Sequence, residues 1–536
     1  MAAIVSSKFR VLNANNFKRD VAEQSVYVSV GKSDAWSNSL SDTTDTIPFT
    51  PNDHFDDIGE ARQQMLGMKK ISSGDISHIV PRHTWTSGNS YYAYDSADAN
   101  IFDKAFYVIT SEFKVYKCIV AGSGASTIQP TQTLTNPTAE SDGYTWKYMY
   151  TVSVADSEKF LTTSYMPVKT VSMGASAIAA AASSSSTTLI LKDVDPDILA
   201  GMQVTGSGVS GTVTVSSVKG SQLTLSSAQT ISADTVLTFA WPSNSAAEAT
   251  LSEADYAQYL NQKASKESST AGGIERLVIT AGGSGYADTD NFVVTITGDG
   301  TGADVVDAGV TIAGGAITAI AINSKGTDYS VADVVISDNG SGADATARAV
   351  IAPTQGHGVD PVAELGAFFV GLNTQLDGSV NGDITVGNDF RQVMLLKSPQ
   401  VYSSSGAYAG ALATADSLKA LGRLDLTGSV ANYNVDEVVT GTTFGAKAFI
   451  AEKDTSGGYL YYYQNSKTGY ANFAAGETIT GGTSGTTGTT ESTQVSNVNN
   501  YPEVDKHSGE VLFLENRTKI DRSATQIEDI KLILEF

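Results

Sequence analysis

The sequence predicts a mainly β protein, and three observations support this class. The 536 residues include 50 glycines, which indicates many tight turns. Long Ser- and Thr-rich stretches alternate with short apolar runs, a pattern typical of short strands joined by turns. Hydrophobic residues make up 41% and charged residues 17%, so a sizeable core is expected. A chain of this length is also expected to contain several modules.

The charge and the hydropathy pattern exclude two classes of partner. The formal net charge is −23, and no Lys/Arg-rich run reverses it locally, which argues against nucleic-acid binding. No apolar run reaches the length of a membrane span, and "MAAIVSSKFR" lacks the pattern of a signal peptide. Cys118 is the single cysteine, so no intramolecular disulfide is expected. Its strand-like context "FKVYKCIVAG" predicts a buried, inert thiol.

The N-terminal region, residues 1–172, has the mixed polarity of a conventional core. Strands are predicted at "SVYVSVGKS", where three valines alternate, at "VYKCIV" and at "GYTWKYMYTVSV". A helix is predicted in "FTPNDHFDDIGEARQQMLGMKKI". Its apolar residues at helical spacing, and the glycine expected to end it, are Phe55, Ile58, Met65, Leu66 and Gly67.

From residue 173 the composition shifts to Ala, Ser, Thr, Val and Gly, which predicts a small β-module over 173–242. A helical bridge is expected over 243–271. Ser252 and Asp255 have the spacing of a capping-box variant at its start. Tyr256, Tyr259 and Leu260 would share one face of this helix.

Two internal duplications follow, each with a period of about 40 residues. In the first, "IERLVITAGGSGYADTDNFVVTITGDGTGADVVDAGV" aligns with "ITAIAINSKGTDYSVADVVISDNGSGADATARAV". The matched pairs are Ile274 with Ile317, Gly283 with Gly326, and Tyr286 with Tyr329. In the second, "DEVVTGTTFG" repeats as "GETITGGTSG", which pairs Glu437 with Glu477, Gly441 with Gly481, and Gly445 with Gly485. Two copies each indicate paired β-units and not an extended solenoid.

Core-like composition returns after each insertion, so we predict one discontinuous core. The predicted parts are the first part of the core (1–172), an inserted β-module (173–242), a helical bridge (243–271), an inserted duplicated β-module (272–352), the second part of the core (353–424), a second inserted duplicated β-module (425–498) and the closing strands of the core (499–536). The last stretch alternates as a half-buried strand, with one parity formed by Ile530, Leu532, Leu534 and Phe536. We expect this strand to close the split core, with Lys531, Ile533 and Glu535 on its opposite face.

Several patterns resemble chemical sites but lack a required residue. Gly31, Lys32 and Ser33 match the tail of a phosphate-binding loop, but Val26 stands where its first glycine is needed. "GGSGYADTD" resembles a calcium-binding nonapeptide, but Ala287 replaces a ligand, and the period is wrong. The nearby acidic residues are expected to be solvated turn residues in preference to an adventitious Ca²⁺ site; they are Asp288, Asp290, Asp299 and Asp304.

Histidines are scarce, and none has a convincing metal-ligand spacing. They are His54, His78, His83, His357 and His507. Pro81 between His78 and His83 disfavours a shared helical face. No local motif selects a nucleophile, although counting carboxylates leaves a glycosidase pair open. The sequence therefore predicts no catalytic residue, no metal ligand and no cofactor, and a small-molecule ligand is not expected.

The core segments, read together, resemble one known family. The matching stretches, in the family's order, are "AIVSSKFR", "VYVSVGKSDAWS", "VPRHTW", "VYKC", "DGYTWKYMY", "FRQVMLLKSP" and "HSGEVLFLENRTKI…QIEDIKLILEF". In series they are similar to the baseplate wedge protein of T4-like contractile-tailed bacteriophages, the gene product eight family. They lie in the N-terminal 170 residues, near residue 390 and at the C-terminal end, the same pieces as the predicted split core.

The resemblance implies a layered β-sandwich core with a few short helices and a two-fold homodimer. It also implies a structural, non-enzymatic role in the virion's tail baseplate, bound to other wedge proteins of the same phage and made in the bacterial host cytoplasm. No catalytic residues come with it. This chain departs from the family pattern by its glycine-rich insertions, which place neighbour contacts in doubt, and by Thr525, where an acidic residue is expected before Gln526.

A second class of function stays open, a glycan-binding or glycan-cleaving phage tail protein. The tyrosine-rich run "GGYLYYYQNSKTGY" motivates it, because tyrosine rings stack on sugars. Cross-strand aromatic packing explains the run equally well.

Overall fold

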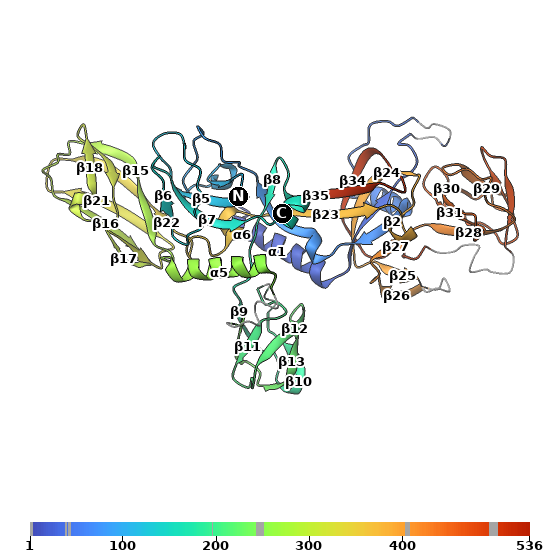
Figure 1. Ribbon diagram of the computed structural model, residues 1–536, viewed down its shortest axis with the longest axis horizontal. Helices are drawn as coiled ribbons and strands as arrows, with labels where there is room; N and C mark the ends of the chain where they lie inside the picture. The colour runs from blue at the N-terminus through green and yellow to red at the C-terminus, as the bar shows by residue number, and fades with distance from the viewer. Residues whose placement is uncertain are drawn as a thin grey trace. The chain divides into compact units, whose positions relative to one another are not determined.

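The computed structural model describes residues 4–37, 40, 44–193, 195, 197–242, 251–402, 408–491 and 502–536. The protein is mainly β, with several sheets and few short helices, which confirms the predicted class (Figure 1). Two compact units are present. The first consists of residues 1–16, 77–371 and 533–536, and the second of residues 17–76 and 372–532.

The chain passes from one unit to the other inside four elements, α1 (Ser7–Glu23), β3 (Ile76–Pro81), β23 (Phe369–Asp377) and β35 (Ile527–Glu535). The three strands belong to a four-stranded sheet with the order β35-β23-β3-β8, where β8 is Tyr165–Pro167. The sequence did not predict α1. The 3₁₀ turns are η1 (Ser73–Asp75), η2 (Ile101–Asp103), η3 (Asp307–Gly309) and η4 (Val380–Gly382).

The first unit is built around an antiparallel sheet with the order β4-β5-β7-β6. These strands are β4 (Tyr107–Ile109), β5 (Lys114–Val120), β6 (Thr138–Ala139) and β7 (Thr145–Thr151), and α3 (Val154–Phe160) follows. Cys118 on β5 is buried as predicted, and burial raises the pKa of its thiol to about 12. The thiol is therefore protonated and unreactive at neutral pH.

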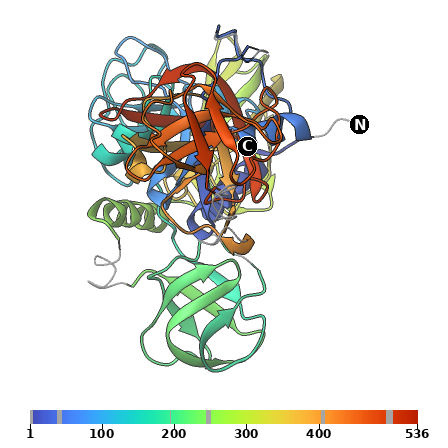
Figure 2. The same ribbon diagram turned by 90° about the vertical axis from the view of Figure 1, so that its right-hand side faces the viewer.

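A six-stranded sheet lies within the segment 173–242, with the order β10-β13-β12-β11-β14-β9. Its strands are β9 (Ala175–Ile178), β10 (Ser183–Ile190), β11 (Gln203–Gly206), β12 (Val213–Lys219), β13 (Gln222–Ile231) and β14 (Val236–Ala240). Figure 2 shows these strands in green. Their hydrophobic core includes Met202, Leu225 and Phe239.

The predicted bridging helix is present as α5 (Glu253–Ser268), and Ser252 caps it by accepting a bond from the Asp255 N–H (3.1 Å). The buried face differs from the prediction, because Leu260 is exposed and the buried residues are Gln258, Gln262 and Ser265. Gln262 explains the difference. Its amide bonds the backbone N–H of Val171 (2.8 Å) and the carbonyl groups of Val171 and Val359, which would otherwise lose their partners on burial.

The first duplicated segment forms four antiparallel pairs, β15–β22, β16–β21, β17–β20 and β18–β19. The strands are β15 (Ile274–Ser284), β16 (Phe292–Gly298), β17 (Thr301–Asp304), β18 (Val310–Ala313), β19 (Ala316–Ile320), β20 (Ser324–Thr327), β21 (Ala332–Asp338) and β22 (Ala343–Ile351). The matched residues pack reciprocally. The Tyr286 hydroxyl accepts from the Ala345 N–H in the second copy, and the Tyr329 hydroxyl accepts from the Ala303 N–H in the first. Each copy thus completes the other. Short helix α6 (Pro361–Leu365) follows.

The second unit contains a five-stranded sheet with the order β27-β2-β1-β24-β34. The strands are β1 (Val26–Gly31), β2 (Met65–Lys70), β24 (Asp389–Lys397), β27 (Ser417–Lys419) and β34 (Glu510–Asp521), and a separate hairpin consists of β25 (Gln400–Tyr402) and β26 (Tyr408–Leu412). All six residues of β1 are buried, so its valines do not alternate between core and solvent as the pattern predicted. A strand paired on both edges and covered on both faces buries both parities.

The prediction of one helix through Met65 and Leu66 is wrong. Helix α2 (Phe55–Gln63) ends earlier, and Met65 begins β2, which pairs with β1 through Val30 and Gly67. Sheet pairing has overridden the helical spacing. Gly67 does not end a helix either: a Cβ there would lie 2.4 Å from the Asp383 carbonyl oxygen, so the position requires glycine for close packing.

The second duplicated segment forms a closed barrel with the order β28-β31-β30-β29-β32-β33. Its strands are β28 (Gly422–Thr427), β29 (Val438–Gly441), β30 (Lys447–Asp454), β31 (Tyr459–Tyr463), β32 (Thr478–Gly481) and β33 (Thr487–Thr490). The matched glutamates are buried and reach across the repeat. Glu437 accepts from the N–H groups of Thr483 and Ser484, and Glu477 accepts from that of Thr443.

The alternation predicted for β35 is present. Ile530 and Leu532 are buried, Leu534 and Phe536 are half-buried, and Lys531, Ile533 and Glu535 are exposed. The Phe536 N–H donates to the Phe368 carbonyl (3.1 Å), and Arg10 bonds the Glu535 carboxylate (2.5 Å). Phe536 is therefore hydrogen-bonded to the neighbouring chain segment, as the sequence predicted.

Two effects require glycine at position 326, its positive φ and the lack of space for a Cβ. Gly314 shows only the first effect, so substitutions at the two positions separate them. Both have positive φ, but a Cβ at Gly326 would lie 2.4 Å from the Ala303 nitrogen, whereas one at Gly314 would meet nothing within 4 Å. Gly314→Ala should cost about 1 to 2 kcal/mol through backbone strain alone. Gly326→Ala should cost about 2 to 5 kcal/mol, because overpacking of about 1 to 3 kcal/mol adds to the strain.

Hydrogen exchange of the β16 and β21 amides in the full chain measures both substitutions. Equal effects of Gly314→Ala and Gly326→Ala would contradict the reciprocal packing of the two copies.

Candidate functional site

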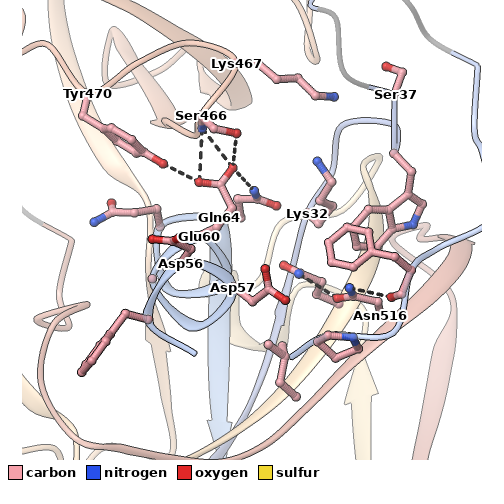
Figure 3. A pocket seen from close by; sticks show the side chains of 18 of the residues that line it. Lys32, Ser37, Asp56, Asp57, Glu60, Gln64, Ser466, Lys467, Tyr470 and Asn516 are labelled. Atoms are coloured by element: carbon pink, nitrogen blue, oxygen red, sulfur yellow. Dashed lines mark hydrogen bonds between the residues drawn. The ribbon is translucent and has the colours of Figure 1, made fainter. Parts of the chain in front are cut away.

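An open pocket of about 620 Å³ lies in the second unit. It is lined by the segment after β1, by helix α2, by a barrel loop that follows β31, and by β34 (Figure 3). Its lining includes the side chains of Lys32, Trp36, Phe49, Phe55, Asp56, Asp57, Glu60, Lys467 and Tyr470. The pocket therefore combines segments that are more than 400 residues apart in the sequence.

A buried carboxylate organises one side of this pocket. The Asp34 side chain is 6% exposed and lies between the ammonium groups of Lys32 (2.8 Å) and Lys467 (2.6 Å). It also accepts from the Asn465 amide (3.1 Å) and the Tyr463 hydroxyl (3.2 Å). Burial alone would raise the pKa of the Asp34 carboxyl, but the two ammonium groups outweigh it and lower this pKa below its ordinary value.

The phosphate-loop pattern has a different role in the structure. Lys32 adopts a left-handed backbone conformation (φ 61°), and its ammonium group bonds Asp34. The Ser33 hydroxyl donates to the Asp436 carboxylate in the barrel (3.0 Å). Gly31 packs closely on β2, because a Cβ there would lie 2.8 Å from the Gln64 carbonyl oxygen. Ser33 thus joins this segment to the barrel, whereas Gly31 and Lys32 make contacts near the sheet.

A second carboxylate ties α2 to the barrel loop. Glu60 accepts from the backbone N–H (2.9 Å) and hydroxyl (2.8 Å) of Ser466, and from the Tyr470 hydroxyl (Figure 3). The Gln64 amide donates to the same carboxylate (2.6 Å). Burial raises the pKa of the Tyr470 phenol, and its hydrogen bond to the Glu60 carboxylate raises this pKa further.

The rest of the pocket wall is acidic and aromatic. Trp36 and Phe49 form an edge-to-face pair with centroids 5.4 Å apart, and Phe55 is 94% exposed. Asp56 and Asp57 lie in the first turn of α2, where carboxylates interact favourably with the helix dipole. Asp34 offsets one of the two lysine charges, and Asp56, Asp57 and Glu60 outnumber the remaining one, so the pocket carries a net negative charge. Such a wall is suited to contact with a basic or apolar protein surface.

The residues singled out in the sequence as possible metal ligands have local roles. Asp299 accepts from the N–H groups of Ser330 and Val331, Asp304 bonds the Asn323 amide, and Asp290 accepts from the Ala287 N–H. Asp288 is exposed. Across the described parts of the chain, no three His, Cys, Asp or Glu side chains are grouped as they would be around a metal ion.

The five histidines are dispersed. His54 caps α2, and His507 lies beside Gln63 at the pocket, with 3.2 Å between their side-chain nitrogens. In the first unit, His78 is buried, and His83 packs edge-to-face on Tyr107. His357 is buried between two carboxylates, those of Glu275 and Glu364.

The tyrosine-rich run lies on β31 with its rings already in contact with other side chains. The Arg423 guanidinium stacks over Tyr459 (4.1 Å) and the Lys419 ammonium lies over Tyr461 (3.8 Å). Tyr463 stacks on Phe449, and Tyr462 contacts Phe473 edge-on. These four rings stabilise the barrel by cation–π and aromatic packing. Tyr470, the last tyrosine of the run, lies outside β31, is 51% exposed and lines the pocket.

Comparison with known families bears on the N-terminal part of the chain. Residues 3–123 match the family model Phage-Gp8, described as Bacteriophage T4, Gp8. The match supports the family resemblance and indicates a structural role in a phage tail baseplate. It covers β1, α2 and β2 of the second unit, including the segment after β1 and the helix α2 that line the pocket, and β4 and β5 of the first unit. No curated protein matches the chain. Within the described residues, no helix combines the length and the apolar character needed to cross a membrane.

Sequence reasoning missed the contacts around Asp34 and Glu60. Asp34 was part of the quoted "VGKSDAW" segment, but its partner Lys467 and the Glu60 partner Ser466 lie over 400 residues away. No local pattern connects such residues. The duplication was the available signal for these contacts, because it indicated that the barrel is a separate unit that must contact another part of the protein.

We expect Asp34→Asn to destabilise the second unit by about 3 to 5 kcal/mol, because it leaves two buried ammonium groups without a counter-charge. The lowered pKa of the Asp34 carboxyl determines how its contribution to the free energy of unfolding depends on pH. Stability from the Asp34 carboxylate is complete above about pH 4 and is lost as pH falls through the lower folded pKa. The deficit of the variant should therefore shrink in acid.

Hydrogen exchange of the β1 amides measures this change. Glu515→Gln is the control, since its pair with Arg517 is over one-third exposed and should contribute less than about 1 kcal/mol. A deficit that is equally small for both variants would contradict the role given to Asp34.

Proposed function

We propose that the chain is a structural, non-enzymatic subunit of a phage tail baseplate wedge. It forms a homodimer and links neighbouring wedge proteins during assembly, after synthesis in the host cytoplasm. The match of residues 3–123 to the Gp8 family carries this proposal. The layered β-sandwich implied by the resemblance belongs to the same proposal.

Strand pairing outside the matched region supports it. Strand β24 contains "FRQVMLLK", and its residues 392–397 pair with all of β1, with Val26 opposite Lys397 and Gly31 opposite Gln392. Strand β34 contains "EVLFLENR" and pairs with β24. In the first unit, β7 with "TWKYMY" pairs with β5. Segments that resemble the family but lie beyond residue 123 therefore extend the sheets that the matched residues begin.

The surface chemistry fits a protein that binds other proteins. The pocket of the second unit presents Phe55 and the Trp36–Phe49 pair beside two carboxylates, a composition found in protein contact surfaces. The reciprocal glutamates and tyrosines of the duplicated modules are used for internal packing.

The purified chain should be a homodimer at micromolar concentration, and it should co-purify with other baseplate proteins when they are expressed together. Light scattering gives the mass, and mass spectrometry identifies the co-purified subunits. A monomer that captures no tail protein would contradict the proposal, and specific binding of the chain to a glycan array would favour the alternative class.

A further inference from the structure

The first unit contains a buried lysine–glutamate contact with reactive surroundings. Lys117 on β5 and Glu364 on α6 have side chains that are 0% and 3% exposed, and the Lys117 ammonium lies directly against Oε2 of Glu364. The Tyr94 ring lies 4.9 Å from the ammonium nitrogen. Removing two charges from water is costly, and chemistry that eliminates both charges is favoured in such a place.

The other oxygen of Glu364 lies in a cradle of backbone donors. Oε1 accepts from the N–H groups of Gly358 (2.7 Å), Val359 (3.0 Å) and Asp360 (3.2 Å). Three fixed N–H groups on one oxygen resemble an oxyanion hole, because they stabilise negative charge on that oxygen during attack at the carboxyl carbon. Gly358 has φ +87°, and a Cβ there would lie 2.5 Å from Lys147 Cε, so the cradle requires glycine.

A buried histidine lies beside this contact. His357 Nδ1 is 3.8 Å from Glu364 Oε2, and its Nε2 is 3.3 Å from Glu275 Oε1. The two carboxylates thus flank the ring at ion-pair distance, and neither ring nitrogen makes a hydrogen bond within the described residues. Nucleophile, electrophile and oxyanion donors come from β5, α6 and the segment before α6 of the same unit.

We propose that Lys117 and Glu364 condense spontaneously into an intramolecular isopeptide bond. One proton passes from the ammonium to Oε2, and the neutral amine attacks Cδ of Glu364. The C–N bond forms, the C–Oε2 bond breaks, and Oε2 leaves as water with two hydrogens that began on the lysine nitrogen. One ammonium and one carboxylate thus become one amide and one water, with no oxidant or reductant.

Two features favour the forward reaction. Burial lowers the pKa of the Lys117 ammonium, which favours the nucleophilic amine, although the nearby carboxylates oppose this shift. The fold also holds the reacting groups in contact in a site that excludes water, so the condensation needs no encounter and its product water is lost to solvent. The pair is assembled only when β5 and α6 meet, so the bond would form after folding.

The bond would close a loop from residue 117 to residue 364 that contains both inserted β-modules of the first unit. A cross-link over a long loop restricts the unfolded chain strongly. A mechanical force applied to either module would then not separate α6 from β5, because the covalent bond would hold them together. This inference does not depend on the proposed baseplate role.

Intact mass spectrometry of the denatured full chain tests the bond. We expect the mass to be lower than the sequence mass by one water, and proteolysis to yield a branched peptide that joins residues 117 and 364. Lys117→Arg removes the nucleophile and keeps the charge, so this variant should regain the full mass. The control is Lys114→Arg on the same strand, whose ammonium bonds the Glu112 carboxylate at the surface (2.7 Å), and it should keep the water loss.

Wild-type protein decides the question even if Lys117→Arg fails to fold. Folded wild-type chain with Lys117 and Glu364 in separate, unmodified peptides would overturn the proposal. So would a water loss that maps to another position, such as a cyclised aspartate.

Discussion

The pairing of β1 with β24 is the constraint on which the second unit depends. All six residues of β1 are buried, so its backbone groups need partners on both edges. One edge is satisfied locally by β2, whereas the other is satisfied by residues 392–397. The chain that connects β2 to β24 must therefore return to this sheet, whatever modules lie along it. Closing a longer loop adds only about 0.6 kcal/mol for each doubling of its length, so large insertions are tolerated.

The two duplicated segments follow a common rule, in which each copy supplies hydrogen-bond partners that the other lacks. In the segment 274–351, Tyr286 and Tyr329 each satisfy an N–H of the opposite copy. In the barrel, Glu437 and Glu477 do the same with carboxylates, and a Cβ at Gly441 would lie 2.7 Å from Glu477. The N–H groups of Ser484 and Asn434 lower the pKa of the Glu437 carboxyl although burial acts against them. Reciprocal polar bonds make both copies necessary.

Patterns with a local cause could be predicted from the sequence. The parity of Ile530 and Leu532, the Ser252 cap of α5 and the burial of Cys118 follow from periodicity, capping chemistry and context. Met65 was misassigned because pairing with β1 decides its conformation, and the polar face of α5 was missed because its glutamines serve backbone groups of other segments. The candidate site could not be predicted, since Asp34 and Lys467 meet only after the barrel attaches to the sheet.

The central claim is that this fold is a structural part of a tail baseplate, with insertions added to a core that resembles the Gp8 family. A cryo-EM map of the intact tail of the phage that encodes the chain tests it most directly. The account predicts paired copies of the chain in the baseplate wedge, with their core strands connected as described and the inserted modules attached to them. A map in which the chain is absent from the baseplate, or is found in a receptor-binding fibre, would contradict it.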